Sequence, residues 1–295
     1  MVSVVIITYK RPVEILFRAI NSVLNQSFTD FEIIIVNDAP EEKELASTIR
    51  DKINILNDNR IKYVEHEMNR GANFARNTGL KRARGKFVAF LDDDDEWLDN
   101  KLELQVKQFD KNKELGLVYC GFKIVCGNTA FDKKTSKSKG FILNCLLEEN
   151  FIGSTSFPLL SKRVLDELGG FDTNLKSCQE YELWIRVAQH YKIDCVEDIL
   201  GVYHISSDST FKGNYASYIE GDTELINKHI KLFKDNPINY SNHLLNMAMY
   251  FFRKKQLLLA IRYKLQAFFV CPYNYKNISL LFLLSKLYNK KFKGE

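Results

Sequence analysis

The sequence has 295 residues, of which 45% are hydrophobic and 27% are charged. Such a chain is long enough to bury a core as one large domain, or as one domain with a smaller appendage, and its composition is that of an ordinary soluble globular protein. Its six cysteines include no Cys-x-x-Cys pair and no tight cluster with histidine. This argues against a zinc site and a disulfide framework and favours a reducing cytoplasm.

Neither end of the sequence predicts a segment that enters a membrane. Met1 leads directly into the apolar run Val2–Thr8, without the basic region and small-residue cleavage site of a signal peptide. The apolar stretch Ile278–Leu284 near the C-terminus is far shorter than the roughly 20 residues that a membrane-spanning helix needs. We therefore expect no signal peptide and no transmembrane anchor.

The net charge of +5 is unevenly distributed along the chain. Residues 223–295 contain 13 lysines and arginines but only 3 acidic residues, whereas acidic residues outnumber basic ones over residues 1–222. We therefore expect the two regions to meet different partners.

The first ninety residues alternate short apolar, β-branched runs with segments of helical spacing. Strands are predicted over Val2–Thr8, Phe31–Val36, Ile61–Glu65 and Phe87–Leu91, and helices over Pro12–Asn25, Glu41–Leu56 and Ala72–Arg84. Strands that are apolar throughout and separated by helices are typical of a parallel sheet covered on both faces. The sequence therefore predicts an α/β fold with a Rossmann-like, mostly parallel sheet.

The middle of the chain continues with mixed elements, and the end is purely helical. Predicted in order are a helix over Asp99–Lys113, a strand over Leu117–Val125, a surface loop or hairpin over Gly127–Lys139, helices over Ser161–Leu168 and Gln179–Tyr191, and an extended segment over Val196–Tyr203. Beyond residue 220 the predicted helices are Thr223–Lys234, Asn242–Phe252, Gln256–Phe269 and Lys276–Tyr288. We therefore predict an α/β domain over residues 1–220 and a basic, all-helical appendage over residues 221–295.

Four consecutive aspartates, Asp92–Asp95, follow the apolar strand Phe87–Leu91. Carboxylates this close repel one another unless water or a cation takes up the charge, and oxygen ligands suit a hard divalent ion. The alternative is an N-terminal cap and solvated turn before a helix that starts near Trp97, although a cap needs only one acidic residue.

Polar residues also follow the first two strands. Thr8, Tyr9 and Arg11 follow the first strand, and Asn37 and Asp38 follow the second. Ligands of parallel sheets bind beyond the carboxyl ends of the strands, so we expect these residues and the aspartates to converge on one crevice.

Together these segments resemble glycosyltransferase family 2. The matching motifs, in the family's order and approximate spacing, are VVIITYKRP at Val4–Pro12, IVND at Ile35–Asp38, NRG at Asn69–Gly71, ARNTG at Ala75–Gly79 and FLDDDD at Phe90–Asp95. The resemblance covers roughly residues 2–210. It implies the GT-A fold and an inverting hexosyl- or N-acetylhexosaminyltransferase that uses a nucleotide sugar and a divalent metal, Mn²⁺ or Mg²⁺.

The resemblance assigns roles within the aspartate run. By the family's D-x-D pattern, Asp94 is the direct metal ligand, and Asp92 lies near the ribose or the water shell of the metal. Because the run has four members, Asp93 or Asp95 can take either part. The divalent ion would act as a Lewis acid on the departing diphosphate.

The resemblance also implies the residues that bind the nucleotide. Asp38 matches the aspartate that accepts a hydrogen bond from the uracil ring, with a cap on the helix near Glu41 as the alternative. Thr8 and Tyr9 match positions that line the base, with Arg11 close by; alternatively, Tyr9 is an edge aromatic that ends its strand. Arg76 is expected to contact the base or the phosphates, with a surface salt bridge as the alternative.

An inverting displacement needs a carboxylate that takes the proton from the acceptor hydroxyl. The segment Gln179–Trp184 resembles the part of the family in which Glu-Asp precedes an aromatic helix, which implies that Glu180 replaces the usual aspartate base. Glu182 and Asp172 are the other candidates for the base, and a first-turn carboxylate favoured by the helix dipole is the alternative interpretation of Glu180.

His204 falls where many relatives carry a polar group near the diphosphate, so we expect it to bind the metal or the phosphates; the alternative is a structural histidine. The basic and aromatic C-terminal residues suit anionic lipid headgroups or a lipid-linked acceptor, and a solvated basic face is the alternative. No nucleic-acid-binding module accompanies this charge, so we expect no nucleic acid partner.

The resulting hypothesis is a metal-dependent inverting glycosyltransferase that moves a sugar, most naturally from a UDP-sugar, to a saccharide or lipid-linked saccharide in bacterial surface polysaccharide or glycan synthesis. We expect it in the cytoplasm, with peripheral attachment to the inner face of the membrane left open. The alternatives are a nucleotidyltransferase acting on sugar phosphates and a noncatalytic saccharide-binding relative. A nucleotidyltransferase should carry a glycine-rich loop after the first strand, and Thr8–Pro12 contains no glycine.

Overall fold

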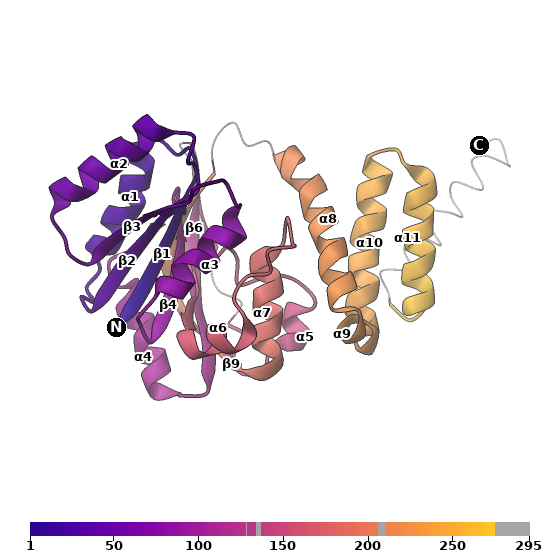
Figure 1. The fold of residues 1–295 in the computed structure, drawn as a ribbon. Helices are drawn as coiled ribbons and strands as arrows, with labels where there is room; N and C mark the ends of the chain where they lie inside the picture. Colours follow the sequence, from indigo (N-terminus) through magenta and orange to yellow (C-terminus); the bar gives the residue numbers. More distant parts are fainter. Residues whose placement is uncertain (128, 134–136, 206–210, 275–295) are drawn as a thin grey trace, which may run out of the picture. The chain divides into compact units, whose positions relative to one another are not determined.

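The computed structural model describes residues 1–127, 129–133, 137–205 and 211–274 (Figure 1). Contacts divide the chain into two compact units. The first comprises Met1–Leu146 and Asn150–Phe211, and the second comprises Leu147–Glu149 and the chain from Lys212 onward. The division of the chain at residue 220 into a catalytic and a helical domain stays a prediction.

The first unit is built on one mixed sheet. Its strands are β1 (Val2–Thr8), β2 (Phe31–Asn37), β3 (Ile61–Glu65), β4 (Phe87–Asp92), β5 (Glu96–Trp97), β6 (Leu115–Cys126), β7 (Thr129–Lys133), β8 (Leu159–Ser161) and β9 (Lys192–Ile205). They lie in the order β3-β2-β1-β4-β8-β6-β9-β5, with β7 paired to β6. The pairs within β3-β2-β1-β4 are parallel, as is β6 with β9, whereas β8, β5 and β7 are antiparallel to their neighbours.

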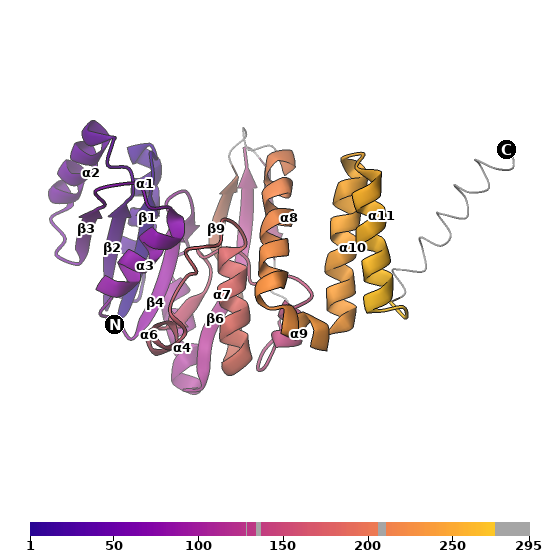
Figure 2. The ribbon, with the colours of Figure 1, turned by 45° about the vertical axis from the view of Figure 1, so that its right-hand side comes forward.

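Helices cover both faces of this sheet, as predicted (Figures 1 and 2). The helices of the first unit are α1 (Val13–Leu24), α2 (Lys43–Leu56), α3 (Ala72–Arg82), α4 (Lys101–Lys111), α5 (Leu143–Leu146), α6 (Lys162–Leu168) and α7 (Gln179–His190). Strand β1 is buried on both sides because its alternate residues enter different cores. Val2, Val4 and Ile6 pack with residues of α1, α2 and α4, and Val5 packs with residues of α3, α6 and α7.

Three short strands refine the sequence-based expectations. The antiparallel strands β5 and β8 were not predicted, because two and three residues carry no recognisable period. The β6–β7 hairpin agrees with the predicted surface loop or hairpin, since all five residues of β7 are exposed.

The second unit is helical, with α8 (Phe211–Lys228), α9 (Ile230–Asp235), α10 (Pro237–Arg253) and α11 (Leu257–Val270). The single helix predicted over Thr223–Lys234 is wrong. It is two helices separated at His229, whose φ of −106° and ψ of 27° leave the helical region. Helices α10 and α11 lie side by side in both views, and the rings of Phe251 and Tyr263 stack at 5.3 Å (Figures 1 and 2).

The predicted helix Lys276–Tyr288 lies outside the described residues. In the part of the chain that the structure describes, no helix is both long enough and apolar enough to cross a bilayer.

Candidate functional site

The carboxyl ends of β1, β2 and β4 surround one cavity of about 470 Å³. The sheet register explains this convergence, because Ile7 of β1 lies between Val36 of β2 and Asp92 of β4. The cavity is lined by Ile7, Thr8, Tyr9, Arg11, Asp38, Asn69, Gly71, Ala72, Ala75, Asp92, Asp93, Asp94 and Tyr203. The polar residues after the three strands therefore share one crevice, as expected from the topology.

The four aspartates are not equivalent. Asp92, Asp93 and Asp94 line the cavity, whereas Asp95 is fully buried. The Asp95 carboxylate accepts hydrogen bonds from Ser156 Oγ at 2.6 Å and from the backbone N–H of His204 at 3.2 Å. Asp95 therefore holds the turn from inside, and the candidates for a direct metal ligand narrow to the other three.

The interpretation of the run as a helix cap is wrong. Strand β5 follows the aspartates directly, and α4 begins only at Lys101. The N-cap position of α4 is Asn100, which lies beyond β5.

Two arginines compensate part of the negative charge. Arg11 donates from Nε to Asp93 at 2.8 Å and from Nη2 to Asp94 at 2.9 Å, and Arg76 donates from Nη2 to Asp92 at 2.8 Å. Despite Arg11, burial raises the pKa of Asp93 to about 6 and also raises the pKa of Asp94. The carboxylates therefore remain short of positive charge, which a bound cation would supply.

These carboxylates fit a divalent cation that takes some of its ligands from the protein and the others from water and a substrate. Among the described residues no cluster of three or more histidine, cysteine or acidic side chains surrounds a common metal position. Mn²⁺ or Mg²⁺ at a phosphate site needs only one or two carboxylates, because water and phosphate oxygens complete the coordination. Asp94, whose side chain is 35% exposed, is the most accessible of the three carboxylates to such an ion.

His204 has a different partner from the one predicted. Its Nε2 lies 2.5 Å from Glu96 Oε1, and Glu96 also pairs with Arg18 at 3.3 Å. The structure thus joins His204 to Glu96 and does not place it in the lining of the cavity. A metal or phosphate role for His204 would require a rearrangement of this pair.

Asp38 shapes one end of the cavity. Its buried carboxylate accepts hydrogen bonds from the backbone N–H groups of Arg70 and Gly71 at 2.9 and 2.7 Å, and it lies 2.7 Å from His66 Nδ1. Gly71 has a φ of +85°, which a residue with a side chain rarely adopts. Asp38 does not cap a helix. Its carboxylate bonds the turn at Arg70 and Gly71, and the N-cap position of α2 is Glu42.

Thr8 and Tyr9 occupy opposite extremes of exposure at the end of β1. Thr8 is buried beside Asp93, whereas Tyr9 is 47% exposed and donates a hydrogen bond to Glu41 at 3.2 Å. Both line the cavity, so the structure keeps them as candidates for contact with a nucleotide.

The ion pair of Arg76 with Asp92 is not on the surface, so the alternative of a surface salt bridge is wrong. Arg76 is buried, and apart from the bond to Asp92 its Nε and Nη1 groups find no hydrogen-bond partner within the described residues. A buried guanidinium with unused donors can bind a phosphate oxygen, since planar N–H groups match that geometry.

Glu180 lies in the first turn of α7 and is partly exposed. Burial raises its pKa, Arg76 opposes this rise, and the negative charge of Asp92 adds to it. Glu180 does not line the cavity, and the structure relates its carboxylate to Arg76 and Asp92 through these electrostatic interactions.

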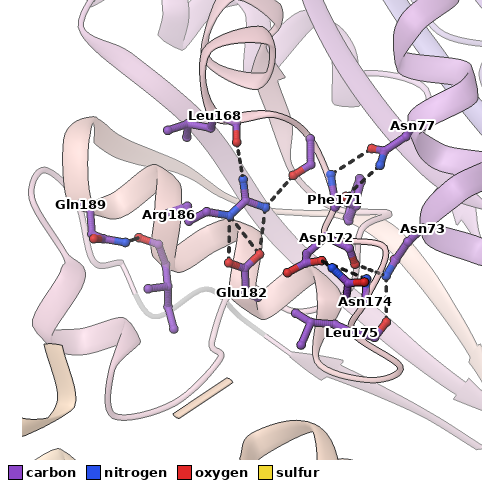
Figure 3. A network of polar contacts seen from close by, with 12 residues as sticks. Asn73, Asn77, Leu168, Phe171, Asp172, Asn174, Leu175, Glu182, Arg186 and Gln189 are labelled. Carbon is purple, nitrogen blue, oxygen red and sulfur yellow. Dashed lines mark hydrogen bonds and ion pairs between the residues drawn. The ribbon is translucent and has the colours of Figure 1, made fainter. Parts of the chain in front are cut away.

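The two other candidates for the base have structural partners (Figure 3). Glu182 is fully buried and bonds Arg186 at 2.8 to 2.9 Å, and Arg186 also donates to the carbonyl oxygens of Leu168 and Gly170. The carboxylate of Asp172 accepts hydrogen bonds from the backbone and side chain of Asn174 at 2.9 and 3.1 Å.

Two asparagines of α3 hold the loop that leads into α7 (Figure 3). Asn77 bonds both the N–H and the carbonyl oxygen of Phe171 at 2.9 and 2.8 Å. Asn73 donates to the carbonyl oxygens of Asp172 and Leu175 at 2.7 and 3.0 Å. Since α3 also carries Arg76, these bonds fix Glu180 relative to the arginine.

Sequence reasoning missed a group of hydroxyl residues beside the aspartates. Thr155 donates to Asp92 at 3.1 Å, Ser154 lies 3.4 Å from the same carboxylate, and Ser156 bonds both Asp95 and the N–H of Asp92. These residues precede β8, and that strand was not predicted, so no signal placed them next to β4.

Comparisons with known proteins show the family and the fold. A family model described as Glycosyl transferase family 2 matches residues 3–169. An uncharacterized glycosyltransferase of Methanocaldococcus jannaschii is 31% identical over 85% of this chain and 86% of its own length. The Escherichia coli UDP-Glc:alpha-D-GlcNAc-diphosphoundecaprenol beta-1,3-glucosyltransferase WfgD is 29% identical over 83% of this chain and 91% of its own length.

A solved structure supports the predicted fold. The mannosyltransferase PcManGT of Pyrobaculum calidifontis, in complex with GDP-Man and Mn²⁺, aligns with a TM-score of 0.64 and 18% identity. The alignment covers 100% of this chain and 88% of that chain. The predicted GT-A fold with helices on both faces and a helical C-terminal region is confirmed.

We predict that Glu182→Gln lowers the free energy of unfolding by about 3 kcal/mol, because it leaves the Arg186 guanidinium without its buried counter-charge. Glu180→Gln, on the same helix, is the matched control and should change stability by less than about 1 kcal/mol. Urea denaturation of both variants makes the comparison. Equal stabilities would contradict the structural role of Glu182.

Proposed function

The chain belongs to glycosyl transferase family 2 and is a glycosyltransferase, and from this premise we propose that it transfers a hexosyl or N-acetylhexosaminyl group with inversion. The proposed donor is a UDP-sugar, and the proposed acceptor is a hydroxyl of a saccharide or lipid-linked saccharide. One observation carries the proposal: Arg76, whose Nε and Nη1 groups have no partner among the described residues, donates a hydrogen bond to Asp92, one of three aspartates that line the cavity.

We assign the diphosphate to the part of the cavity beside Asp92 and Asp94, next to the Arg76–Asp92 pair. A divalent cation held by Asp94, with Asp92 in support, would neutralise charge that develops on the diphosphate as it departs. Arg76 would direct its free N–H groups to a phosphate oxygen while its third nitrogen stays on Asp92. Arg11 keeps Asp93 and Asp94 in their orientation through its two hydrogen bonds.

The nucleotide would lie against Thr8, Tyr9 and the corner that Asp38 holds. The name of WfgD specifies UDP-Glc, whereas PcManGT was solved with GDP-Man. Our choice of a UDP-sugar follows the more similar relative, and both nucleotides belong in any test.

Glu180 would take the proton from the acceptor hydroxyl as that oxygen attacks the anomeric carbon opposite the diphosphate. Its raised pKa makes the carboxylate a stronger base than an exposed glutamate. The attachment of its helix to α3 keeps it near Arg76, so the base and the leaving-group side belong to one rigid framework.

We also propose that the helical C-terminal region attaches the enzyme to an anionic membrane surface. Helix α11 exposes Leu258, Ile261, Leu265 and Phe269, which are 51% to 85% exposed and whose spacing places them on one helical face. Basic residues accompany this face, with Arg262 on α11 and Arg253–Lys255 just before it. An apolar helical face beside cations is typical of interfacial helices, and the name of WfgD specifies a GlcNAc that is linked through a diphosphate to the lipid undecaprenol.

We predict that UDP with Mn²⁺ raises the melting temperature by about 5 °C at roughly 100 times its Kd, and that UDP alone has a much smaller effect. Asp94→Asn should remove the metal-dependent part of the shift and abolish turnover. Asp110→Asn, on the exposed surface of α4, serves as the control. The measurement is differential scanning fluorimetry with UDP and GDP, each with and without Mn²⁺. The proposal would be refuted if the melting temperature of the wild type showed no metal-dependent shift.

Glu180→Gln should leave the shift by UDP and Mn²⁺ intact while turnover falls by roughly 10²- to 10⁴-fold, because a general base is lost. The base acts only when deprotonated, so wild-type kcat should be full above the raised pKa of Glu180 and fall as the pH is lowered through it. That acidic limb should begin above the ordinary glutamate pKa of 4.5 and disappear from the residual activity of the variant. If turnover survives, the base is another residue.

The membrane proposal predicts co-flotation with vesicles that contain phosphatidylglycerol, and weaker binding at high salt. Leu258→Glu should reduce the bound fraction by about tenfold, because burial of a leucine contributes roughly 1.5–3 kcal/mol. Ile55→Glu, at an 81% exposed position of α2, is the matched control and should bind like the wild type. Equal binding of the wild type to neutral vesicles would count against anionic headgroups.

A further inference from the structure

Tyr203 lines the cavity, and neither the proposed metal site nor the proposed nucleotide site uses its side chain. It is near the end of β9, where its neighbour Val202 pairs with Glu96 of β5 directly after the aspartates. Its ring packs edge-on against Phe157 with the ring centres 6.4 Å apart. The short strand β5 thus brings Tyr203 into the same cavity wall as Asp92, Asp93 and Asp94.

The surroundings of the Tyr203 hydroxyl are acidic. Burial raises the pKa of Tyr203 to about 12, and the negative charges of Asp95, Asp92, Asp94 and Glu180 add to this effect. The phenol therefore keeps its proton throughout the physiological pH range and acts as a hydrogen-bond donor. Yet this hydroxyl forms no hydrogen bond with any residue that the structure describes.

The geometry of the proposed reaction indicates which part of the substrate lies next to the Tyr203 hydroxyl. In an in-line displacement the anomeric carbon is between the departing diphosphate and the base. The diphosphate side of the proposed site contains Asp92 and Asp94, and the base side contains Glu180. Tyr203 lines the same cavity as Asp92 and Asp94, so its side chain borders the space on the diphosphate side.

On the basis of the proposed function, we infer that Tyr203 is a further substrate-contacting residue, whose hydroxyl donates a hydrogen bond to an oxygen of the sugar being transferred. We assign the contact to the sugar and not to the nucleotide, because β2, which leads to Asp38 at the proposed nucleotide site, and β9, which carries Tyr203, lie on opposite sides of β4 in the sheet. Tyr203 therefore distinguishes a nucleotide that carries a sugar from a free nucleoside diphosphate. A polar group built to bond a substrate oxygen contributes to selectivity for substrates that have it.

Tyr203→Phe tests this inference with minimal disturbance. The variant retains the ring that packs against Phe157 and removes only a hydroxyl without a described protein partner. Tyr191→Phe is the matched control, because the Tyr191 hydroxyl bonds Glu167 on the surface at 2.5 Å. Thermal melts of both variants establish that they are folded.

The measurement is the Kd by titration calorimetry for UDP, UDP-glucose and UDP-N-acetylglucosamine, each with Mn²⁺, together with kcat and KM for hydrolysis of the two donors. We expect Tyr203→Phe to bind UDP within twofold of the wild type. For the donor that the wild type hydrolyses faster, we expect kcat/KM to fall by about tenfold, the effect of one lost hydrogen bond of roughly 1.4 kcal/mol.

Three outcomes would overturn the inference, and they can be told apart. If the wild type binds no nucleotide and hydrolyses neither donor, the proposed function fails and the role of Tyr203 fails with it. If the wild type is active and Tyr203→Phe matches it with every ligand, only the inference fails. If the variant loses UDP and UDP-sugar affinity equally, the hydroxyl serves the nucleotide and contact with the sugar is refuted.

Discussion

Mutual repulsion among four adjacent carboxylates is the constraint on which the rest of the site depends. The carboxyl end of β4 places Asp92, Asp93 and Asp94 in one cavity wall, and these charges are stable only with compensation from elsewhere. Arg11 supplies it from the end of β1, and Arg76 supplies it from α3. The remaining shortage of positive charge suits this end of the sheet to a cation, and in the proposed function that cation in turn binds the diphosphate.

Helix α3 links that charged centre to the second half of the site. One of its residues, Arg76, faces the aspartates, while Asn73 and Asn77 bond the backbone of the loop before α7. A buried asparagine that satisfies backbone groups constrains a loop more strictly than apolar packing does, since the bonds have direction. The position of Glu180 therefore depends on the same helix as the principal phosphate-binding candidate.

Much of the fold was predictable because its signals are local. The strands Val2–Thr8 and Ile61–Glu65 agree with the structure residue for residue, since a short β-branched run bounded by polar residues is typical of a strand. The short strands β5 and β8 and the break at His229 were not predictable, because each results from a partner that lies far away in the sequence or from a single change of backbone angle.

For the site, the sequence by itself determined which residue types stand at the strand ends, because chain order and strand direction bring Thr8, Asp38 and the aspartates to one edge. Only the tertiary structure decided which of those side chains face the cavity and which have partners elsewhere in the protein. In the structure Asp95 is buried and accepts a hydrogen bond from Ser156, and His204 pairs with Glu96. Glu182 bonds Arg186, and Tyr203 lines the same cavity as the aspartates. The reason is physical: orientation and burial of a side chain depend on contacts across the fold, and a residue's position in the sequence does not encode those contacts locally.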